Sequence, residues 1–550
     1  MRLALLAALS LLLLPLAAAQ APADTTRIVV MATTDLHGHL LPWDYYADRP
    51  DERLGLAKVA TLVDSVRAAH AHTLLVDAGD FFQGNPFAEF FAREDSLGTS
   101  PTVAAFDALA YDAAVLGNHE FNFGLGVLHR RLRQTATPML AANVTLAGTD
   151  APAYAPYVLR RVGTLTVGIV GLTTPGSAVW DRPRVAGRLA FGDGVAAARR
   201  YVAEARARGA DVVVVVAHSG LEGPSSFSAE GLGAENFGRA VAETVPGVDA
   251  LVIGHSHRTL ATALAGADGR PVPVVQAGRW GDHLGVIELA LVRASDGAAR
   301  VAAHAVRVHP VRHARAHPTV VALAAEGHEA VRAFLAEPVA TTSGLWPTER
   351  GRLEPTAAVG LIHAAQRAAT GAQLSAASAF TTALTLGPDG LSRAQLAQLY
   401  PYENALYTVR ISGRDLRAYL EHGAQYYLPP DTPGAAPRVN PRWPGYNFDA
   451  IDGVTYTLDL ARPVGERVQG LAFGGRPVRD DDVFTMAVNS YRAEGGGGFP
   501  GMTPEAVVAQ IDRPVRALIE DFLAERGHVA PEDVLGTTTW RVTPEPAGSR

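Results

Sequence analysis

The sequence predicts an α/β protein of two domains, and three observations support this. The chain has 550 residues, more than one ordinary hydrophobic core holds, so two domains are expected. From Thr26 to about Val308, short β-branched runs alternate with helical stretches rich in alanine and arginine. Continuous apolar strands that alternate with helices are typical of an α/β sheet buried on both faces. A second α/β segment follows and extends to about Thr543.

Six apolar runs are the expected strands of the first segment. In chain order they are RIVVMATTD, TLLVDAGD, DAAVLGNHE, LTVGIVGLTT, DVVVVVAHSG and ALVIGHSH, and each ends in polar residues. In sheets of this type a ligand site lies beyond the carboxyl ends of the strands. The polar residues that follow these runs are therefore candidates for one shared cleft.

A change of pattern marks the expected boundary between the domains. The stretch from His317 to Pro338 has the apolar spacing of one amphipathic helix, and the alternation of strands stops there. The sequence thus predicts an N-terminal domain over residues 24–312, a connector over 313–340 and a C-terminal domain over 341–545. In the C-terminal domain we expect a helix near residues 357–371 and strands at ALYTVRISG and GVTYTLDL.

The N-terminus has the pattern of a secretory signal peptide. Arg2 precedes a leucine-rich run, and the small residues Ala17–Ala19 follow it, which predicts cleavage of residues 1–19. The alternative is an uncleaved membrane anchor, but the apolar run is short for a span and Pro15 stands late in it. We therefore expect a mature protein that has no membrane span and is periplasmic or secreted.

Composition and charge exclude several functions. Hydrophobic residues make up 48% of the chain and charged residues 19%, which indicates a globular protein and not a disordered one. The formal net charge of −7 argues against a nucleic-acid polymer as partner, because such binding needs a basic face. The chain has no cysteine, which removes disulfides, thiolate catalysis and cysteine-bound zinc. Any metal ion must be held by Asp, Asn, His or Glu.

The polar residues at the strand ends are of the types that bind metal ions. They are Asp35 and His37 in TTDLHGH, Asp80 in DAGD, Asn118 and His119 in GNHE, His218 in AHSG, and His255 and His257 in GHSH. Carboxylate, imidazole and amide ligands suit Zn, Mn, Fe or Co. Each motif alone is weak evidence, since a single histidine after a strand is more often a hydrogen-bonded core residue. The ordered set predicts a site for two divalent metal ions, which activate water and neutralise charge on phosphate oxygens.

The ordered set D-x-H, G-D, G-N-H-E, H and G-H-x-H resembles that of the calcineurin-like metallophosphoesterases. With a signal peptide and a second domain of this size, the chain resembles the bacterial two-domain 5′-nucleotidase family over almost all of its mature length. The resemblance implies an N-terminal metallophosphoesterase β-sandwich flanked by helices. It also implies a C-terminal α/β nucleotide-binding domain.

The resemblance further implies a role for each motif residue. One metal ion would be held by Asp35, His37, Asp80 and His257, and the other by Asp80, Asn118, His218 and His255, so that Asp80 is shared. His119 corresponds to a histidine that binds no metal but stabilises the transition state and helps the leaving group depart. Glu120 is expected to support the site structurally, and His39 to line the cleft or lie on the surface.

In the C-terminal domain the resemblance points to a nucleoside site. Tyr402 and Tyr491 correspond to two aromatic rings that sandwich a nucleobase, and Asn404 to a polar residue that helps hold the nucleoside. Stacking tolerates any base because every base has a π-face. The glycines Gly495, Gly496 and Gly497 would let the backbone approach the nucleoside closely. Without the resemblance, two packing tyrosines would be the simpler interpretation.

Three departures from the 5′-nucleotidase pattern favour one branch of the family. Gly360 stands where an arginine for the 5′-phosphate is expected, a second arginine turn is missing, and Asn122 replaces an aspartate near the catalytic histidine. The stretches DLHGHLLPWDYY, GNHEFNFG, YPYENALY and NFDAIDGVTY are similar to the 2′,3′-cyclic-nucleotide 2′-phosphodiesterase/3′-nucleotidase branch. The expected substrates are therefore 2′,3′-cyclic nucleotides and the 3′-nucleotides that they yield, which are hydrolysed in turn to nucleoside and phosphate.

Two alternatives stay open from the sequence. A 5′-nucleotidase or UDP-sugar hydrolase would turn over 5′-AMP faster than 3′-AMP. A catalytically dead nucleotide-binding protein would release no phosphate with any metal ion, although the intact set of ligand residues argues against it. A structural protein of the surface-layer type has no support, because the chain shows no repeat.

Overall fold

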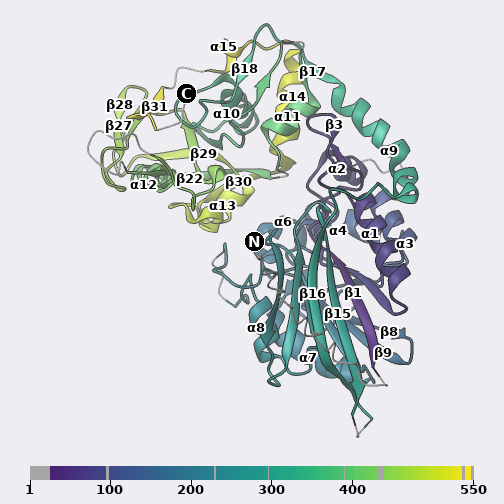
Figure 1. Ribbon diagram of the computed structural model, residues 1–550. Helices are drawn as coiled ribbons and strands as arrows, with labels where there is room; N and C mark the ends of the chain where they lie inside the picture. Colours follow the sequence, from purple (N-terminus) through teal and green to yellow (C-terminus); the bar gives the residue numbers. More distant parts are fainter. Residues whose placement is uncertain are drawn as a thin grey trace, which may run out of the picture.

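The computed structural model describes residues 25–546, apart from residues 94–97, 228–230, 295–296, 389, 403, 430–437 and 536–538. It confirms the predicted two-domain α/β architecture (Figure 1). The predicted signal peptide, residues 1–19, lies outside the described residues. In the described part of the chain, no helix has the length and apolar character that a membrane crossing requires.

Two six-stranded sheets form the N-terminal domain, in the orders β16-β15-β1-β4-β5-β6 and β13-β14-β12-β11-β9-β8. Their strands are β1 (Thr26–Thr33), β4 (Thr73–Asp77), β5 (Ala113–Val115), β6 (Met139–Leu140), β8 (Tyr157–Val162), β9 (Leu165–Leu172), β11 (Val212–Ala217), β12 (Ala250–Ile253), β13 (Thr259–Ala265), β14 (Pro271–Ala277), β15 (His283–Arg293) and β16 (Ala299–Pro310). The six strands predicted from apolar runs are all present. They divide between the sheets, since β1, β4 and β5 are parallel in one and β9, β11 and β12 are parallel in the other.

The two sheets face each other across an aliphatic core that includes Ile28, Val76, Val167 and Val214. Helices cover the outer faces. Those on the first sheet are α1 (Leu56–Ala69), α2 (Pro86–Arg93), α3 (Pro101–Ala108), α4 (Gly124–Leu132) and α9 (Pro318–Ala336), and those on the second are α7 (Gly194–Ala207) and α8 (Gly238–Thr244). The central strands are therefore buried on both faces, which explains why they are continuous apolar runs and not alternating ones.

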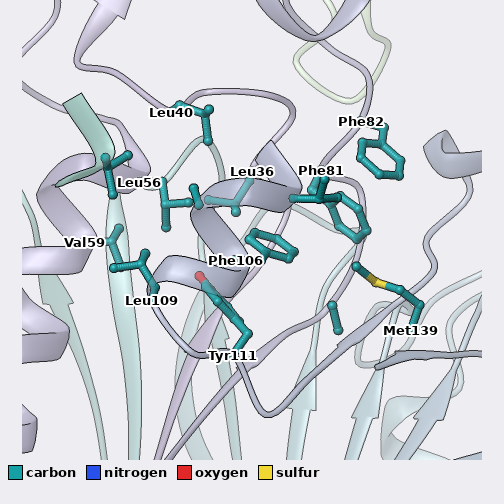
Figure 2. Close-up of a cluster of buried hydrophobic side chains, with 14 of the residues drawn as sticks. Leu36, Leu40, Leu56, Val59, Phe81, Phe82, Phe106, Leu109, Tyr111 and Met139 are labelled. Atoms are coloured by element: carbon teal, nitrogen blue, oxygen red, sulfur yellow. The ribbon is translucent and has the colours of Figure 1, made fainter. Parts of the chain in front are cut away.

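The apolar cluster outside the first sheet anchors the loops that follow its strands. Figure 2 shows Leu36 and Phe81 in this cluster together with Phe106, and the rings of Phe81 and Phe106 lie 5.0 Å apart. Leu36 and Phe81 are both 0% exposed. Leu36 stands between two polar residues of the first motif, and Phe81 directly follows Asp80. Burial of these apolar neighbours holds the polar side chains of both loops in place.

Helix α9 covers the stretch that the sequence predicts to be one amphipathic helix, and it begins after the capping residue His317, while the predicted domain bounds stay predictions. The C-terminal domain has a five-stranded sheet, β25-β19-β29-β22-β30, and a four-stranded sheet, β28-β27-β26-β31. Its strands are β19 (Leu374–Ser378), β22 (Ala405–Ser412), β25 (Asp449–Asp452), β26 (Thr455–Asp459), β27 (Val468–Phe473), β28 (Arg476–Pro477), β29 (Val483–Asn489), β30 (Val507–Pro514) and β31 (Trp540–Thr543). Its helices are α10 (Ala357–Thr370), α11 (Arg393–Leu399), α12 (Gly413–Gly423), α13 (Ser490–Ala493), α14 (Val515–Arg526) and α15 (Pro531–Val534).

These elements confirm the helix and the two strands predicted for the second domain, with Gly371 ending α10 in a left-handed conformation. Short elements complete the fold. They are the strands β2 (Trp43–Asp44), β3 (Arg49–Pro50), β7 (Val144–Leu146), β10 (Leu189–Phe191), β17 (Pro338–Ala340), β18 (Trp346–Pro347), β20 (Thr385–Leu386), β21 (Leu391–Ser392), β23 (Tyr427–Leu428) and β24 (Arg438–Val439), and the helices α5 (Ser177–Trp180) and α6 (Arg182–Val185).

The two domains touch at a buried ion pair between Arg516 of α14 and Glu89 of α2. Elsewhere in the interface, α13 lies on the side of the C-terminal domain that faces α6 (Figure 1). The charges of Asp181 and Arg182, at the start of α6, act on the carboxyl group of Glu494 just after α13. The C-terminal domain therefore lies over the end of the sandwich that carries the strand-end loops.

Candidate metal centre and nucleotide site

The backbone of the strand-end loops is strained at the residues predicted to bind metal. Five of them have left-handed conformations with φ between 46° and 67°, namely Asp35, His37, Asp80, His255 and His257. This region costs a residue other than glycine roughly 1 kcal/mol or more, although Asp tolerates it better than most residues do. Strain of this kind is typical of functional sites, where the surrounding packing enforces it.

The structure brings the predicted ligands together in three overlapping groups. In each group the potential ligand atoms lie within 4.8 Å of one another, and the groups are Asp35, His37 and His257; His37, Asp80 and His119; and Asp80, His218 and His255. Asn118 joins them, because its Oδ1 lies 3.0 Å from Nε2 of His218. All seven predicted ligands and His119 therefore surround one polar centre at the ends of both sheets.

Asp80 has the central position that a ligand shared by two ions requires. Its Oδ2 lies 3.0 Å from Nε2 of His218, 3.8 Å from Nε2 of His119 and 4.0 Å from Nε2 of His37. Burial alone would lower the pKa of His218, but the negative charges of Asp80 and Asp35 outweigh it and raise this pKa to about 10. The centre thus concentrates negative charge in a place that attracts cations.

An unpartnered oxygen shows that the donor set fits a metal ion. Asp35 is 0% exposed, and its Oδ2 has no hydrogen-bond partner within the described ranges. Burial raises the pKa of Asp35 to about 7. A buried carboxylate oxygen without a partner is costly, and a divalent cation would satisfy it. The Nε2 atoms of His37 and His257 lie only 2.9 Å apart, as expected of two ligands of one ion.

Hydrogen bonds outside the centre fix the imidazole rings. Nδ1 of His37 donates to a backbone carbonyl 2.7 Å away, and Nδ1 of His218 donates to another at 2.8 Å, so Nε2 of each ring faces the centre. In His255 the order is reversed, because Nε2 donates to Oε1 of Glu235 at 2.7 Å and leaves Nδ1 for a metal ion. Such bonds set the tautomer and the basicity of a ligand. Glu235 is 20 residues from His255 and belongs to no motif, so its role could not be predicted from the sequence.

Glu120 is a structural group, as the sequence analysis expected. Its Oε2 accepts from the backbone N–H groups of Gly117 at 2.7 Å and Asp80 at 2.8 Å. Its Oε1 accepts from those of Phe81 at 2.8 Å and Phe82 at 3.0 Å. The carboxylate is 2% exposed and so ties the loop after β4 to the loop after β5.

His119 differs from the ligands in its hydrogen bonds. Its Nδ1 lies 2.6 Å from Oδ1 of Asn122, and its Nε2 faces the centre. Nδ2 of Asn122 donates in turn to Oδ1 of Asp181 at 3.0 Å. The structure therefore confirms that an amide contacts this histidine, and it adds a carboxylate behind the amide that no motif revealed.

The sequence predicts that His39 either lines the cleft or lies on the surface. The surface position is wrong, because this residue is only 8% exposed. Its ring stacks on Trp280 at 5.0 Å, and burial lowers its pKa to about 4. The Arg279 guanidinium also lies 4.0 Å from the centre of the Trp280 ring, and its Nη1 is 3.3 Å from Nδ1 of His257. Arg279, which the sequence analysis did not single out, thus places a positive charge at the rim of the metal centre.

Charges at this rim act on two of the predicted nucleoside residues of the C-terminal domain, since Arg279 tends to lower the pKa of Tyr402 and Glu235 to raise that of Tyr491. Tyr402 is 40% exposed, and its ring lies 6.5 Å from that of Tyr446, a further tyrosine that is 42% exposed. Burial raises the pKa of Tyr491 to about 12, with smaller contributions from Tyr446, Glu235 and Tyr402. Glu235, which contacts His255, also contributes to raising the pKa of Tyr446, so Tyr446 and Tyr491 lie within electrostatic range of the metal centre across the domain interface.

The glycine run makes room for protein groups beside this tyrosine cluster. A Cβ atom at Gly496 would lie 2.6 Å from the ring of Tyr491, and one at Gly497 would lie 2.5 Å from Nη1 of Arg492. Gly495 has φ of 92°, which favours glycine. The run therefore folds beneath the Tyr491 ring and supports it, while its approach to a nucleoside stays a prediction.

Two other predicted positions are also placed by the structure. Asn404 is half-buried, and its backbone carbonyl accepts from Val515 at 2.9 Å. At Gly360 a Cβ atom would lie 2.6 Å from the carbonyl oxygen of Val534, so no arginine fits in α10 at this point.

A two-sheet sandwich with an Asp/His/Asn centre at its strand ends defines a metal-dependent phosphoesterase. Comparison with known proteins agrees with this class. Residues 28–259 match the model of the calcineurin-like phosphoesterases, and residues 338–504 match that of the 5′-nucleotidase C-terminal domain.

Relatives cover nearly the whole chain. The 2′,3′-cyclic-nucleotide 2′-phosphodiesterase/3′-nucleotidase of Salmonella typhimurium is 31% identical, and the match spans 97% of this chain and 91% of that protein. The enzyme of the same name from Haemophilus influenzae is 30% identical over 94% of this chain and 87% of its own. The solved structure of a 5′-nucleotidase precursor from Thermus thermophilus has the same fold, with a TM-score of 0.64 and 24% identity over 95% of this chain and all of that one. The chain therefore belongs to the 5′-nucleotidase family and carries a calcineurin-like phosphoesterase domain.

Proposed function

We propose that this protein hydrolyses 2′,3′-cyclic nucleotides to 3′-nucleotides and then hydrolyses these to nucleoside and phosphate. The observation that carries the proposal is the position of Tyr402, Tyr446 and Tyr491 beside the metal centre, where a base and its phosphate can be held together. The absence of room for an arginine at Gly360 supports a 3′-phosphate over a 5′-phosphate. The names of the Salmonella typhimurium and Haemophilus influenzae relatives support it as well.

The ligand residues fit two divalent ions. Asp35, His37, Asp80 and His257 would hold one ion, and Asp80, Asn118, His218 and His255 the other. When bound, such a pair supplies an activated water and neutralises the negative charge that develops on the phosphate. Mn, Co, Zn and Fe all suit this set of ligands.

His119 acts on the leaving group. Its Nε2 faces the centre, and in the imidazolium form it donates its proton to the departing ribose oxygen as the P–O bond breaks and leaves its electron pair on that oxygen. In the first stage this is the 2′ oxygen, which stays on the product as a hydroxyl group. In the second stage it is the 3′ oxygen, and inorganic phosphate is released.

The tyrosines act on the base. Stacking of a base on an aromatic ring contributes about 1–3 kcal/mol and depends little on which base is present. Tyr402 and Tyr491 would hold the base between them while the phosphate reaches the centre, and the exposed ring of Tyr446 offers a third aromatic surface. The active site would then form only where the two domains meet.

A panel of nucleotides tests the proposal. Phosphate release from 3′-AMP and from 2′,3′-cyclic AMP should be faster than from 5′-AMP, each with added Mn²⁺. Faster turnover of 5′-AMP would show the alternative, a 5′-nucleotidase or UDP-sugar hydrolase. Lack of phosphate release from all substrates, with bound nucleotide detected by calorimetry, would show a catalytically dead binding protein.

We also propose that the protein acts in the periplasm or outside the cell. This rests on the predicted signal peptide of residues 1–19. N-terminal sequencing of the exported chain should begin at Gln20, and a chain recovered only from the cytoplasm with Met1 intact would contradict it.

A further inference from the structure

A buried carboxylate lies two hydrogen bonds from the Nδ1 atom of His119. Asp181 stands between α5 and α6 and is 1% exposed. Its Oδ1 accepts from Asn122, while its Oδ2 has no hydrogen-bond partner in the described part of the chain. Burying a carboxylate with one unpaired oxygen is unfavourable, so packing alone gives no reason for an acid at this position.

The amide between the two groups can take two orientations, and the charge of Asp181 selects one. With Nδ2 of Asn122 toward Asp181, the amide oxygen faces Nδ1 of His119, as the structure shows at 2.6 Å. The opposite orientation would place the amide oxygen against the carboxylate, which is repulsive. Burial raises the pKa of Asp181 to about 6, so the group is ionised at neutral pH and favours the first orientation.

The orientation of the amide fixes the proton on His119. An amide oxygen can only accept, so Nδ1 of His119 must carry hydrogen. In the imidazolium form the second proton is then on Nε2, which faces the metal centre and gives this proton to the leaving group. An orienting partner of this kind keeps a catalytic histidine in the tautomer that the reaction needs.

The segment that carries Asp181 is itself fixed against the metal centre. The neighbouring residue Trp180 stacks on the ring of His255 at 5.7 Å with 25° between the planes. Asp181 is therefore held at a set distance from the centre on the side of His119. Its contact with Asn122 spans 59 residues of sequence, which is why no local motif includes it.

We propose that Asp181 is a positioning residue that acts through Asn122 to orient His119 and keep its Nδ1 protonated. The role rests on the proposed function of His119 as the proton donor to the leaving group. Through the Asn122 amide, Asp181 supplies the negative charge that an aspartate at position 122 would supply directly. No proton moves between Asp181, Asn122 and His119. The Nε2 proton of His119 goes to the ribose oxygen, and the Nδ1 hydrogen stays in place.

The test compares leaving groups that do and do not need a proton. Asp181→Asn removes the negative charge, so the side-chain amides at positions 122 and 181 can each rotate into either orientation. The substitution should lower kcat for 3′-AMP by about 10–100-fold, which is part of the effect of a general acid. Hydrolysis of p-nitrophenyl phosphate, whose leaving group departs as a stable anion, should fall less than about 3-fold. KM and bound metal, measured by atomic emission, should stay unchanged. Asp150→Asn on the surface serves as the matched control.

A double variant tests whether Asp181 acts through Asn122. Asn122→Asp combined with Asp181→Asn exchanges the amide and the carboxylate, so kcat for 3′-AMP should recover to within about 5-fold of the starting protein, as compensation between contacting residues allows. Equal losses on both substrates, no loss on 3′-AMP, loss of metal, or no recovery in the double variant would each overturn the proposal. If the protein prefers 5′-AMP, the proposed function fails, but the same comparison with 5′-AMP still tests Asp181.

Discussion

Glu120 offers the sharpest test of how the two metal loops are held. Its two oxygens accept four backbone N–H groups, and the side chain is 2% exposed. In Glu120→Gln one oxygen becomes an NH₂ group that cannot accept. Whichever way the amide turns, two of the four donors then face another donor.

The magnitude follows from those two donors. A buried donor left without a partner costs about 1–3 kcal/mol, so the substitution should lower the free energy of unfolding by roughly 2–6 kcal/mol. Because the donors belong to the loop of Asp80 and to the turn before Asn118, metal affinity should also fall, by about 10–100-fold.

Urea unfolding, with and without Mn²⁺, measures the first effect, and calorimetric titration of the chelated protein with Mn²⁺ measures the second. Glu525→Gln is the matched control, since this glutamate is exposed and such surface changes stay within about 0.5 kcal/mol. A Glu120→Gln protein that is as stable as the control variant and binds metal normally would refute the reasoning.

Three further predictions concern metal, base and pH. Chelation should abolish phosphate release and lower Tm, and Mn²⁺ or Co²⁺ should restore both, because bound metal stabilises the folded state; activity that survives exhaustive chelation would contradict the metal assignment. Tyr491→Ala should raise KM for 3′-AMP by roughly 5–100-fold, from about 1–3 kcal/mol of stacking, and change KM for bis(p-nitrophenyl) phosphate little; equal effects on both would exclude stacking. Burial raises the pKa of Glu494 to about 8 from a usual value of 4.5, so ionisation of this group lowers stability progressively as pH rises from about 4.5 to 8. Glu494→Gln should therefore match the starting protein at pH 4 and exceed it at pH 9 by on the order of 3 kcal/mol, allowing for partial exposure, in urea unfolding at each pH; a constant difference across that range would show that the shift is not the cause.

Much of this fold could be predicted because the strands are buried on both faces. A strand such as β11, five valines and an alanine, has only one reasonable interpretation, and the polar residue that follows it must lie at a strand end. The candidate metal ligands could be located for the same reason, since each lies within four residues of the end of such a run, and their role as ligands stays a prediction. The division of the six strands between two sheets could not, because apolar runs do not specify which strands pair.

The missed residues share a different property. Glu235 and Asp181 lie in loops and Tyr446 in a single 3-10 turn, and each meets its partners across long sequence separations or across the domain interface. Their side chains act through distance and orientation and not through local spacing, so nothing in AENFG or VWDRPR sets them apart from ordinary loop residues. The expectation for His39 failed on its surface alternative because Trp280, which covers it, comes from a distant loop.

The left-handed backbone at five ligand positions has a consequence for how this protein can evolve. At roughly 1 kcal/mol or more each, Asp35, His37, Asp80, His255 and His257 make the unloaded fold less stable than the same fold with glycine at those positions. A lineage that no longer needed catalysis would gain stability by replacing these residues one at a time, because the first replacement would already be stabilising. Their joint presence in one chain is what continued selection for the metal centre would leave behind.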